Sequence, residues 1–268
     1  MEQVAHPERF DPRDQGGTLI DTEHRGRYWW AARAAEGRDV LDAGCGTGYG
    51  MSILSAAGAT SVTGVDIDPA AVAEAGERFG DPQAVVQGDL LDLPLPDAAF
   101  DVVVCFEAIE HVADGERAIG ELRRVLRPDG VLLISSPNPA VYPSGNEHHV
   151  HEYRPDELAA AVGELFSNVE AYSQHPWLAT RIEPADRTRG DGARRDDEAP
   201  AQTRTTATID ADGETYAIVA ASDAPLPALG DLVVLGSAFE VSWWSQHAAN
   251  VETEADRSVT TLLLPQEY

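Results

Sequence analysis

The sequence predicts an α/β fold in which a mostly parallel sheet carries helices on both faces. Three observations support this fold. Apolar, β-branched segments alternate with helical segments from Asp39 to about Thr180, which is the pattern of parallel strands joined by helical crossovers. A glycine-rich turn follows the first strand. An acidic residue, Asp66, ends the second strand 22 residues after Gly44, about the spacing at which doubly wound sheets place an acid against a ribose.

The predicted elements follow one another in a regular order. Strands are expected at residues 39–43, 61–66, 84–87, 100–105 and 130–136, and helices at residues 49–57, 69–79, 114–127 and 155–165. An aromatic helix is expected before them, over residues 21–33. Residues 169–177 are a candidate sixth strand, and residues 216–222 a candidate seventh strand that is antiparallel.

The first strand, the glycine-rich turn and the next helix occupy residues 39–50. The glycines at 44, 46, 48 and 50 give the spacing GxGxG, and Tyr49 stands where a dinucleotide-binding turn has glycine. Asp42 lies two residues before the first glycine. A carboxylate there repels a pyrophosphate but suits a positively charged ligand. S-adenosylmethionine (SAM) carries a sulfonium and an ammonium and no phosphate, so the turn favours SAM over NAD.

Three further signals follow at the ends of later strands. Asp66 precedes Asp68 and Pro69, and Asp68 is the better helix cap, which leaves Asp66 for a ligand. The strand near residue 85 ends in Gly88-Asp89, whose carboxylate suits an exocyclic amine. The apolar strand from Phe100 leads into a polar stretch at the sheet edge where ligands bind in such folds.

Val40–Gly48 resembles the first motif of class I SAM-dependent methyltransferases, and the resemblance covers about residues 20–175. It implies a Rossmann-like, seven-stranded sheet with a reversed last hairpin, and SAM as the cofactor. It also implies that Asp66 binds the ribose, that Ile67 packs on the adenine and that Asp89 lies near the adenine amino group. The cofactor-binding residues predicted on this basis are Arg27, Asp42, Gly44, Cys45, Gly46, Asp66, Ile67, Asp89, Leu90 and Phe106.

Methyl transfer is a direct displacement at the methyl carbon, and it needs a base only when the acceptor is a hydroxyl. Glu107, Glu110 and His111 follow the fourth strand. Cys105–Val112 resembles a stretch of ubiquinone-pathway O-methyltransferases, some of which are thought to bind a divalent cation there. In the alternative, Glu110 and His111 cap the following helix and shape the pocket. We adopt this alternative and predict no metal site.

A second candidate for chemistry is the loop at residues 136–153, whose many Pro, Gly, Asn and His residues are typical of a substrate loop. Its His149-x-x-Glu152-Tyr resembles methyltransferases found among surface-polysaccharide genes. Residues 23–28 resemble the same proteins, which implies that Arg27 binds the methionyl carboxylate of SAM. Gly26 and Glu147-His148 depart from that pattern. The predicted catalytic residues are His111, His149 and Glu152.

The composition is strongly acidic. The 268 residues include 46 acidic and 19 basic residues, for a net charge of −27, and every basic residue is arginine. This composition resembles that of proteins from salt-accumulating halophiles, and an acidic mesophilic protein is the alternative. The lack of a basic stripe argues against a nucleic-acid substrate. Cys45 and Cys105 are expected to form no disulfide. No signal peptide or long apolar run is apparent, which predicts a cytoplasmic protein.

Four regions are predicted along the chain. Residues 1–38 form an N-terminal helical cap, and residues 39–182 form the SAM-binding core. Residues 183–213 are charged and almost without apolar side chains, which is typical of a mobile loop. Residues 214–268 form the last strand and a C-terminal tail that packs on the core. A partner or lipid surface is the alternative contact of that tail.

The predicted function is methylation of a sugar hydroxyl or of a hexuronic acid on a cell-surface glycan precursor, which is a small molecule or lipid-linked. A quinone or another small metabolite is the alternative acceptor. In an alternative from a different functional class, the protein is a regulator that binds SAM but catalyses no reaction. The sequence gives no oligomeric state.

Overall fold

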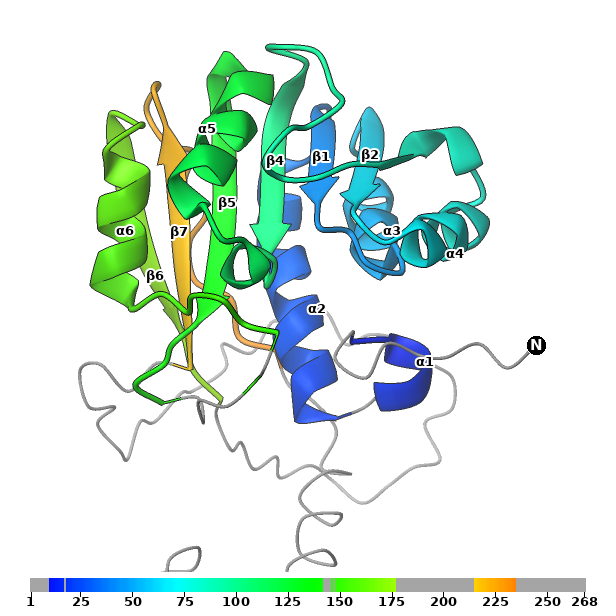
Figure 1. Cartoon of the computed structure of the whole chain (residues 1–268), viewed down its shortest axis with the longest axis horizontal. Helices are drawn as coiled ribbons and strands as arrows, with labels where there is room; N and C mark the ends of the chain where they lie inside the picture. The colour runs from blue at the N-terminus through cyan, green and yellow to red at the C-terminus, as the bar shows by residue number, and fades with distance from the viewer. Residues whose placement is uncertain (1–9, 17, 142–145, 147, 177–214, 235–268) are drawn as a thin grey trace, which may run out of the picture.

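The computed structural model describes residues 10–16, 18–141, 146, 148–176 and 215–234 (Figure 1). In this part of the chain the strands are β1 (Asp39–Ala43), β2 (Ser61–Asp66), β3 (Val85–Gln87), β4 (Phe100–Phe106), β5 (Leu126–Pro137), β6 (Asn168–Gln174) and β7 (Tyr216–Ser222). The helices are α1 (Pro12–Gln15), α2 (Leu19–Ala31), α3 (Tyr49–Ala56), α4 (Pro69–Phe79), α5 (Gly115–Val125) and α6 (Pro155–Gly163), and the 3-10 helices are η1 (Ala32–Ala34), η2 (Pro82–Ala84) and η3 (Ile109–His111).

These strands form one seven-stranded sheet in the order β3-β2-β1-β4-β5-β7-β6. Strands β1 to β5 pair in parallel, and β7 is antiparallel to both β5 and β6. The arrow of β7 accordingly runs against that of β5 in Figure 1. The predicted mostly parallel, Rossmann-like sheet with a reversed last hairpin is therefore confirmed. The strand order reverses between β1 and β4, and open α/β sheets bind ligands beside such a switch point.

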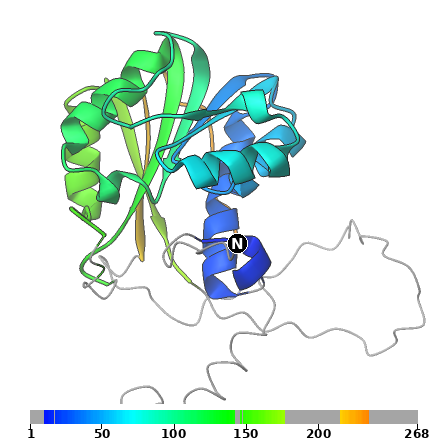
Figure 2. The ribbon, with the colours of Figure 1, turned by 45° about the vertical axis from the view of Figure 1, so that its right-hand side comes forward.

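Helices cover both faces of the sheet (Figure 2). Alternate residues of each strand point to opposite faces because the side-chain period of a strand is two. Leu41 and Val103 belong to one buried cluster with Leu122 of α5 and Leu158 of α6. The neighbouring residues Val40, Val102 and Val104 belong to a second cluster, which contains Tyr28 and Trp30 of α2, Met51 and Leu54 of α3, and Ala75 of α4.

The observed boundaries differ from the predicted ones at the start of β5. Helix α5 ends at Val125, two residues earlier than predicted, and β5 begins at Leu126 rather than at residue 130. Leu126 pairs with Phe100, and the next paired residues are Val131 and Val102. The longer segment of β5 between these two pairs bulges out of the register. This pairing extends the strand through Pro128 and Gly130, two residue types that usually indicate a loop.

Several predictions lie outside the described residues. They include the charged segment 183–213, the tail beyond residue 234 and the position of Glu147. Cys45 and Cys105 are both buried, and they are not joined in a disulfide, so the prediction that they form none is confirmed. In the described part of the chain, no helix has the length and apolar character needed to cross a bilayer.

Candidate functional site

The turn after β1 has a backbone that glycine favours. Gly44, Gly46 and Gly48 have φ angles of 83°, 53° and 77°, in the left-handed region that residues with a Cβ rarely adopt. A Cβ at Gly44 would lie 2.6 Å from Cβ of Ala108, and one at Gly48 would lie 2.9 Å from Cβ of Ala75. The turn therefore packs against α4 and against the segment after β4, which brings the ends of β1 and β4 together.

Asp66 joins the end of β2 to this turn. Its Oδ2 accepts the backbone N–H of Gly46 at 2.9 Å, and its Oδ1 accepts that of Asp68 at 3.0 Å. Asp68 caps α4 by accepting the N–H of Ala70, as predicted. The expectation that Asp66 is left for a ligand needs revision, because both of its oxygens already accept backbone bonds. Each carboxylate oxygen has a further lone pair, so a ribose hydroxyl can still bind.

The residues beside Asp66 suit a flat apolar group. Ile67 follows it and is 65% exposed, which is unusual for isoleucine. Asp89, after β3, is exposed, and its Oδ1 accepts the N–H of Leu91 at 2.9 Å. The Leu90 and Phe106 side chains are buried. An acid for hydroxyl groups and an exposed apolar side chain thus lie next to each other at the end of β2.

Asp42 is a buried carboxylate at the carboxyl end of β1. It has no solvent exposure. Its Oδ1 accepts the Tyr28 hydroxyl at 2.9 Å, whereas its Oδ2 has no hydrogen-bond partner within the described structure. Burial raises the pKa of Asp42 to about 7; the Tyr28 hydrogen bond opposes that rise, and the Asp66 charge adds to it. A buried oxygen without a partner favours a ligand that donates hydrogen bonds or carries positive charge.

Arg27 of α2 is a buried guanidinium, only 1% exposed. Its Nη1 donates to Oε1 of Gln174 at 2.8 Å, and its guanidinium stacks on the ring of Tyr216 at 4.3 Å. Its Nη2 lies 3.9 Å from Oε1 of Glu107. Among the described residues, Nε and Nη2 have no hydrogen-bond partner. These two nitrogens form one edge of the planar group, which is the edge that binds a carboxylate through two parallel bonds.

Glu107 connects Arg27 to the end of β4. Its φ of 51° is in the left-handed region, which costs a residue with a side chain about 1–3 kcal/mol. The Ser135 hydroxyl of β5 donates to its Oε1 at 2.7 Å, and its own N–H donates to Ser135 Oγ at 3.3 Å. Such strain is common at binding sites.

Sequence patterns did not identify Tyr28, Gln174 or Ser135 as partners of Asp42, Arg27 and Glu107, because each partner lies on a different element from the charge that it contacts.

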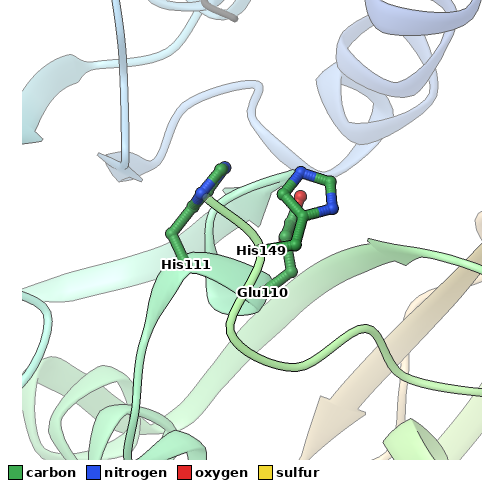
Figure 3. A group of neighbouring side chains, drawn as sticks. All are labelled: Glu110, His111 and His149. Carbon is green, nitrogen blue, oxygen red and sulfur yellow. The ribbon is translucent and has the colours of Figure 1, made fainter. Parts of the chain in front are cut away.

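A second group of polar side chains lies just beyond β4. Glu110 of η3 is 1% exposed, and its carbonyl oxygen accepts the N–H groups of Val150 at 2.7 Å and His151 at 3.1 Å. These bonds hold the loop after β5 against η3. As a result the rings of His111 and His149 are 4.9 Å apart (Figure 3). Burial, with the nearby charge of Glu107, raises the pKa of Glu110.

Each histidine of this group bonds an oxygen through one ring nitrogen. His149 Nδ1–H donates to Oε1 of Glu152 at 2.6 Å, and His111 Nδ1–H donates to the carbonyl oxygen of His148 at 3.1 Å. The structure therefore brings the predicted catalytic residues His111, His149 and Glu152 together. His151 contacts Glu157 instead, with 2.7 Å between Nε2 and Oε1.

The prediction that Glu110 and His111 cap the next helix is wrong. Helix α5 is capped by Asp114, whose Oδ1 accepts the N–H of Arg117 at 3.1 Å. Glu110 and His111 instead form a separate 3-10 turn, and Glu110 uses its backbone carbonyl to hold the loop after β5. Glu110 and His111 thus belong to the polar group and do not begin α5.

Comparisons with known proteins place methyltransferases among the relatives of this chain. Residues 41–134 match the family model described as methyltransferase domain. A relative from Mycolicibacterium smegmatis, described as a probable S-adenosylmethionine-dependent methyltransferase, is 42% identical over 139 residues, which are 52% of this chain and 53% of that protein. The demethylmenaquinone methyltransferase of Deinococcus radiodurans is 34% identical over 161 residues, 56% of this chain and 66% of that protein. The chain spans about half the length of the first of these relatives, 53%.

Solved structures show the same fold. The N-methyltransferase NodS of Bradyrhizobium japonicum, in complex with S-adenosyl-L-homocysteine, has a TM-score of 0.55 at 17% identity, over 80% of this chain and 92% of that one. The protein solved with the Trm112 methyltransferase activator of Haloferax volcanii has a TM-score of 0.55 at 21% identity, over 81% of this chain and 95% of that one.

Proposed function

We propose that this chain, whose residues 41–134 form a methyltransferase domain with SAM as its cofactor, is an enzyme that methylates an oxygen atom of a glycan precursor. The acceptor is a sugar hydroxyl or a hexuronic acid carboxylate on a small or lipid-linked precursor of a surface glycan. The observation that carries this proposal is the hydrogen bond of 2.6 Å between His149 and Glu152 beside His111. This bond supports the proposal because it would orient His149 as a base near the candidate cofactor residues.

The candidate cofactor residues fit the separate parts of SAM. The oxygen of Asp42 without a partner suits the ammonium, and the two open nitrogens of Arg27 suit the carboxylate of the methionyl group. Asp66 would bind the ribose, and the exposed side chain of Ile67 would pack on the adenine. We assign supporting roles to the backbone of Gly44, Cys45 and Gly46, to the carboxylate of Asp89, and to the apolar side chains of Leu90 and Phe106.

The proposed reaction needs few protein groups. The acceptor oxygen uses a lone pair to form the new bond to the methyl carbon, the bond from that carbon to sulfur breaks, and its electrons return to sulfur. When the acceptor is a hydroxyl, its proton passes to Nε2 of His149. Glu152 holds the opposite ring nitrogen and stabilises the resulting imidazolium, and His111 packs against the ring. A carboxylate acceptor requires alignment but no base.

A quinone or another small metabolite is the second candidate acceptor. The demethylmenaquinone methyltransferase of Deinococcus radiodurans is 34% identical over 161 residues. Its match to this chain supports the view that related methyltransferase cores act on different acceptors, a quinone among them.

Transfer of a labelled methyl group from SAM into fractionated cell extract tests the acceptor. The glycan proposal expects label in the lipid-linked or soluble sugar fraction. Label confined to the quinone or small-metabolite fraction would contradict the glycan and support the second candidate. Label in no fraction, together with SAM binding, would contradict enzymatic function and favour a SAM-binding regulator.

The acidic composition leads us to propose that the protein works in a salt-rich cytoplasm. A net charge of −27 destabilises a compact chain by self-repulsion. Salt shortens the screening length from about 10 Å at 0.1 M to about 3 Å at 1 M. We therefore expect the melting temperature to rise steeply as KCl increases from 0.1 M to 2 M, as followed by circular dichroism. A melting temperature that stays flat or falls over this range would contradict the proposal.

The raised pKa of Asp42 predicts a pH dependence of SAM binding. The charged carboxylate attracts the SAM ammonium, and protonation removes that attraction. We expect SAM affinity to fall as the pH drops from 7.5 to 5.5 through the pKa of about 7, by up to about tenfold per pH unit. Calorimetry at each pH measures this, and the Asp42→Asn variant should show a flat, weaker profile. An equally steep profile in that variant would assign the effect to another group.

The raised pKa of Asp42 also determines how the folding stability of the protein changes with pH. The folded protein keeps the Asp42 proton up to a higher pH than the unfolded chain, in which an aspartate titrates near 3.8. The contribution of this carboxyl to folding is thus complete below about pH 4 and is lost as the pH rises through about 7. Asp42→Asn should accordingly raise the melting temperature of the free protein most at pH 8.

A further inference from the structure

We propose that Glu110, His111 and His149 bind a divalent transition-metal ion, and that this ion leaves a coordination position open toward the acceptor. One potential ligand atom from each of the three residues lies within 4.8 Å of those from the other two. Glu110 and His111 come from η3 after β4, and His149 comes from the loop after β5. Their side chains extend to the same side of the ribbon in Figure 3. The proposed methyl transfer does not by itself require this ion.

The carboxylate of Glu110 has a buried oxygen that a metal ion would satisfy. The residue is 1% exposed, and its Oε2 is buried without a hydrogen-bond partner in the part of the chain that the structure describes. Buried polar atoms are nearly always satisfied, and an exception calls for a missing partner. A carboxylate oxygen of Glu110 lies within 4.8 Å of a ring nitrogen of each of the two histidines. A cation held between them and the carboxylate would supply that partner.

The hydrogen bonds of His111 and His149 fix the tautomer that a metal ligand needs. A carbonyl oxygen and a carboxylate only accept hydrogen bonds, so Nδ1 carries the proton in both His111 and His149. In a neutral imidazole this tautomer places the lone pair on Nε2. Metal-bound histidines characteristically donate their other ring N–H to a carboxylate or a backbone carbonyl, which fixes the ring orientation. His149 has the carboxylate form of this arrangement, and His111 has the carbonyl form.

The backbone holds the two segments in this arrangement. The carbonyl oxygen of Glu110 accepts the N–H groups of both Val150 and His151. These bonds flank His149 on its C-terminal side and tie its loop to the turn that carries the other two ligands. The site is therefore positioned by main-chain bonds before any ion binds, which lowers the cost of ordering the ligands.

The donor set indicates the class of ion. Two imidazole nitrogens and one carboxylate oxygen suit Zn²⁺, Fe²⁺, Co²⁺ or Ni²⁺, whereas Mg²⁺ and Ca²⁺ prefer oxygen ligands. Three protein ligands leave room for a further ligand, as in catalytic zinc sites. When bound, such an ion would lower the pKa of an acceptor hydroxyl, and His149 would then serve as a ligand while the ion activates the hydroxyl.

This set differs from the cluster suggested by the sequence, which joined Glu107 to Glu110 and His111. Oε1 of Glu107 accepts the Ser135 hydroxyl and lies 3.9 Å from Nη2 of Arg27. Glu107 is therefore part of the charge pair with Arg27. The structure replaces it with His149, from a segment that lies 38 residues further along the chain than His111 (149 − 111).

Cobalt titration of the chelator-treated protein tests the site without any methyl transfer. We expect one Co²⁺ per chain, read from its visible absorption, and displacement by Zn²⁺ but not by Mg²⁺. Glu110→Gln and His149→Ala should each weaken Co²⁺ binding by about 100-fold or more, and Glu152→Gln by about 10-fold, as for residues that orient a ligand. His151→Ala is the matched control in the same loop, since His151 contacts Glu157, and it should bind Co²⁺ as the unmodified protein does.

Binding of S-adenosyl-L-homocysteine, measured on the same samples, verifies that each variant is folded. Failure of the unmodified protein to bind Co²⁺ would overturn the metal site, as would Co²⁺ binding that His149→Ala leaves unchanged. Either result would leave the proposed methyl transfer standing with His149 as a base. Conversely, Co²⁺ binding with the expected variant pattern, but without methyl transfer to any acceptor, would leave the metal site standing and overturn the proposed function.

Discussion

Replacing His149 by alanine is expected to slow methyl transfer to a hydroxyl acceptor by about 10²- to 10⁴-fold, the range for loss of a positioned acid–base group. SAM affinity should stay within about twofold of the unmodified value, because its predicted contacts lie on other residues. The effect follows whether His149 takes the acceptor proton directly or holds the proposed ion. Initial rates at saturating SAM, with equilibrium binding of SAM measured in parallel, separate the two quantities.

Two further variants sharpen this test. Glu152→Gln keeps the shape of the side chain but removes the charge that we propose stabilises the His149 imidazolium, so it should slow transfer less than His149→Ala does. His151→Ala removes a histidine from the same loop whose partner is Glu157, and it should leave the rate unchanged. A normal rate in His149→Ala would contradict its catalytic role, and a lost SAM affinity in that variant would assign His149 to the cofactor site.

Replacing Asp66 by alanine is expected to weaken SAM binding by about 100-fold. Two effects combine in this loss. The ribose would lose its proposed hydrogen-bond acceptor, worth about 1.5–3 kcal/mol for a bond to a charged group. The N–H groups of Gly46 and Asp68 also lose the carboxylate that fixes the turn between β1 and α3. Calorimetric titration of SAM into each protein at pH 8 measures the change.

Asp68→Ala is the matched control for this variant. Asp68 lies two residues away and caps α4 through the N–H of Ala70. Its loss should cost about 1 kcal/mol of stability with little effect on SAM affinity. If Asp66→Ala and the unmodified protein bound SAM equally well, the proposal that Asp66 binds the ribose would be contradicted. Equal losses in both variants would show that SAM affinity follows the general stability of this region.

Local patterns in the sequence were sufficient to predict most of the fold. The glycine spacing after β1 indicated the turn, because left-handed backbone at Gly44, Gly46 and Gly48 restricts the choice of residue. The alternation of apolar segments with helical segments predicted the strands and the helices on both faces of the sheet. The start of β5 at Leu126 was missed because it depends on pairing with Phe100, and neither residue reveals that partner locally.

The candidate site was predicted less completely, for the same physical reason. The bond from Tyr28 to Asp42 joins α2 to β1, and the bond from Arg27 to Gln174 joins residues 147 apart. Side-chain partners at such separations leave no periodic signal in the sequence. The capping role expected for Glu110 and His111 failed because Asp114, a better N-cap residue, stands a few positions later. Only the folded chain shows that His149 joins them.

The most direct test of the account is competitive binding of SAM and NAD to the unmodified protein in concentrated KCl. We predict that one SAM binds per chain and that Asp66→Ala loses this affinity. We also predict no competition from NAD, because the buried Asp42 carboxylate favours an ammonium over a pyrophosphate. Binding of NAD in place of SAM, or SAM binding that Asp66→Ala leaves intact, would contradict the assignment of this sheet edge as the SAM site.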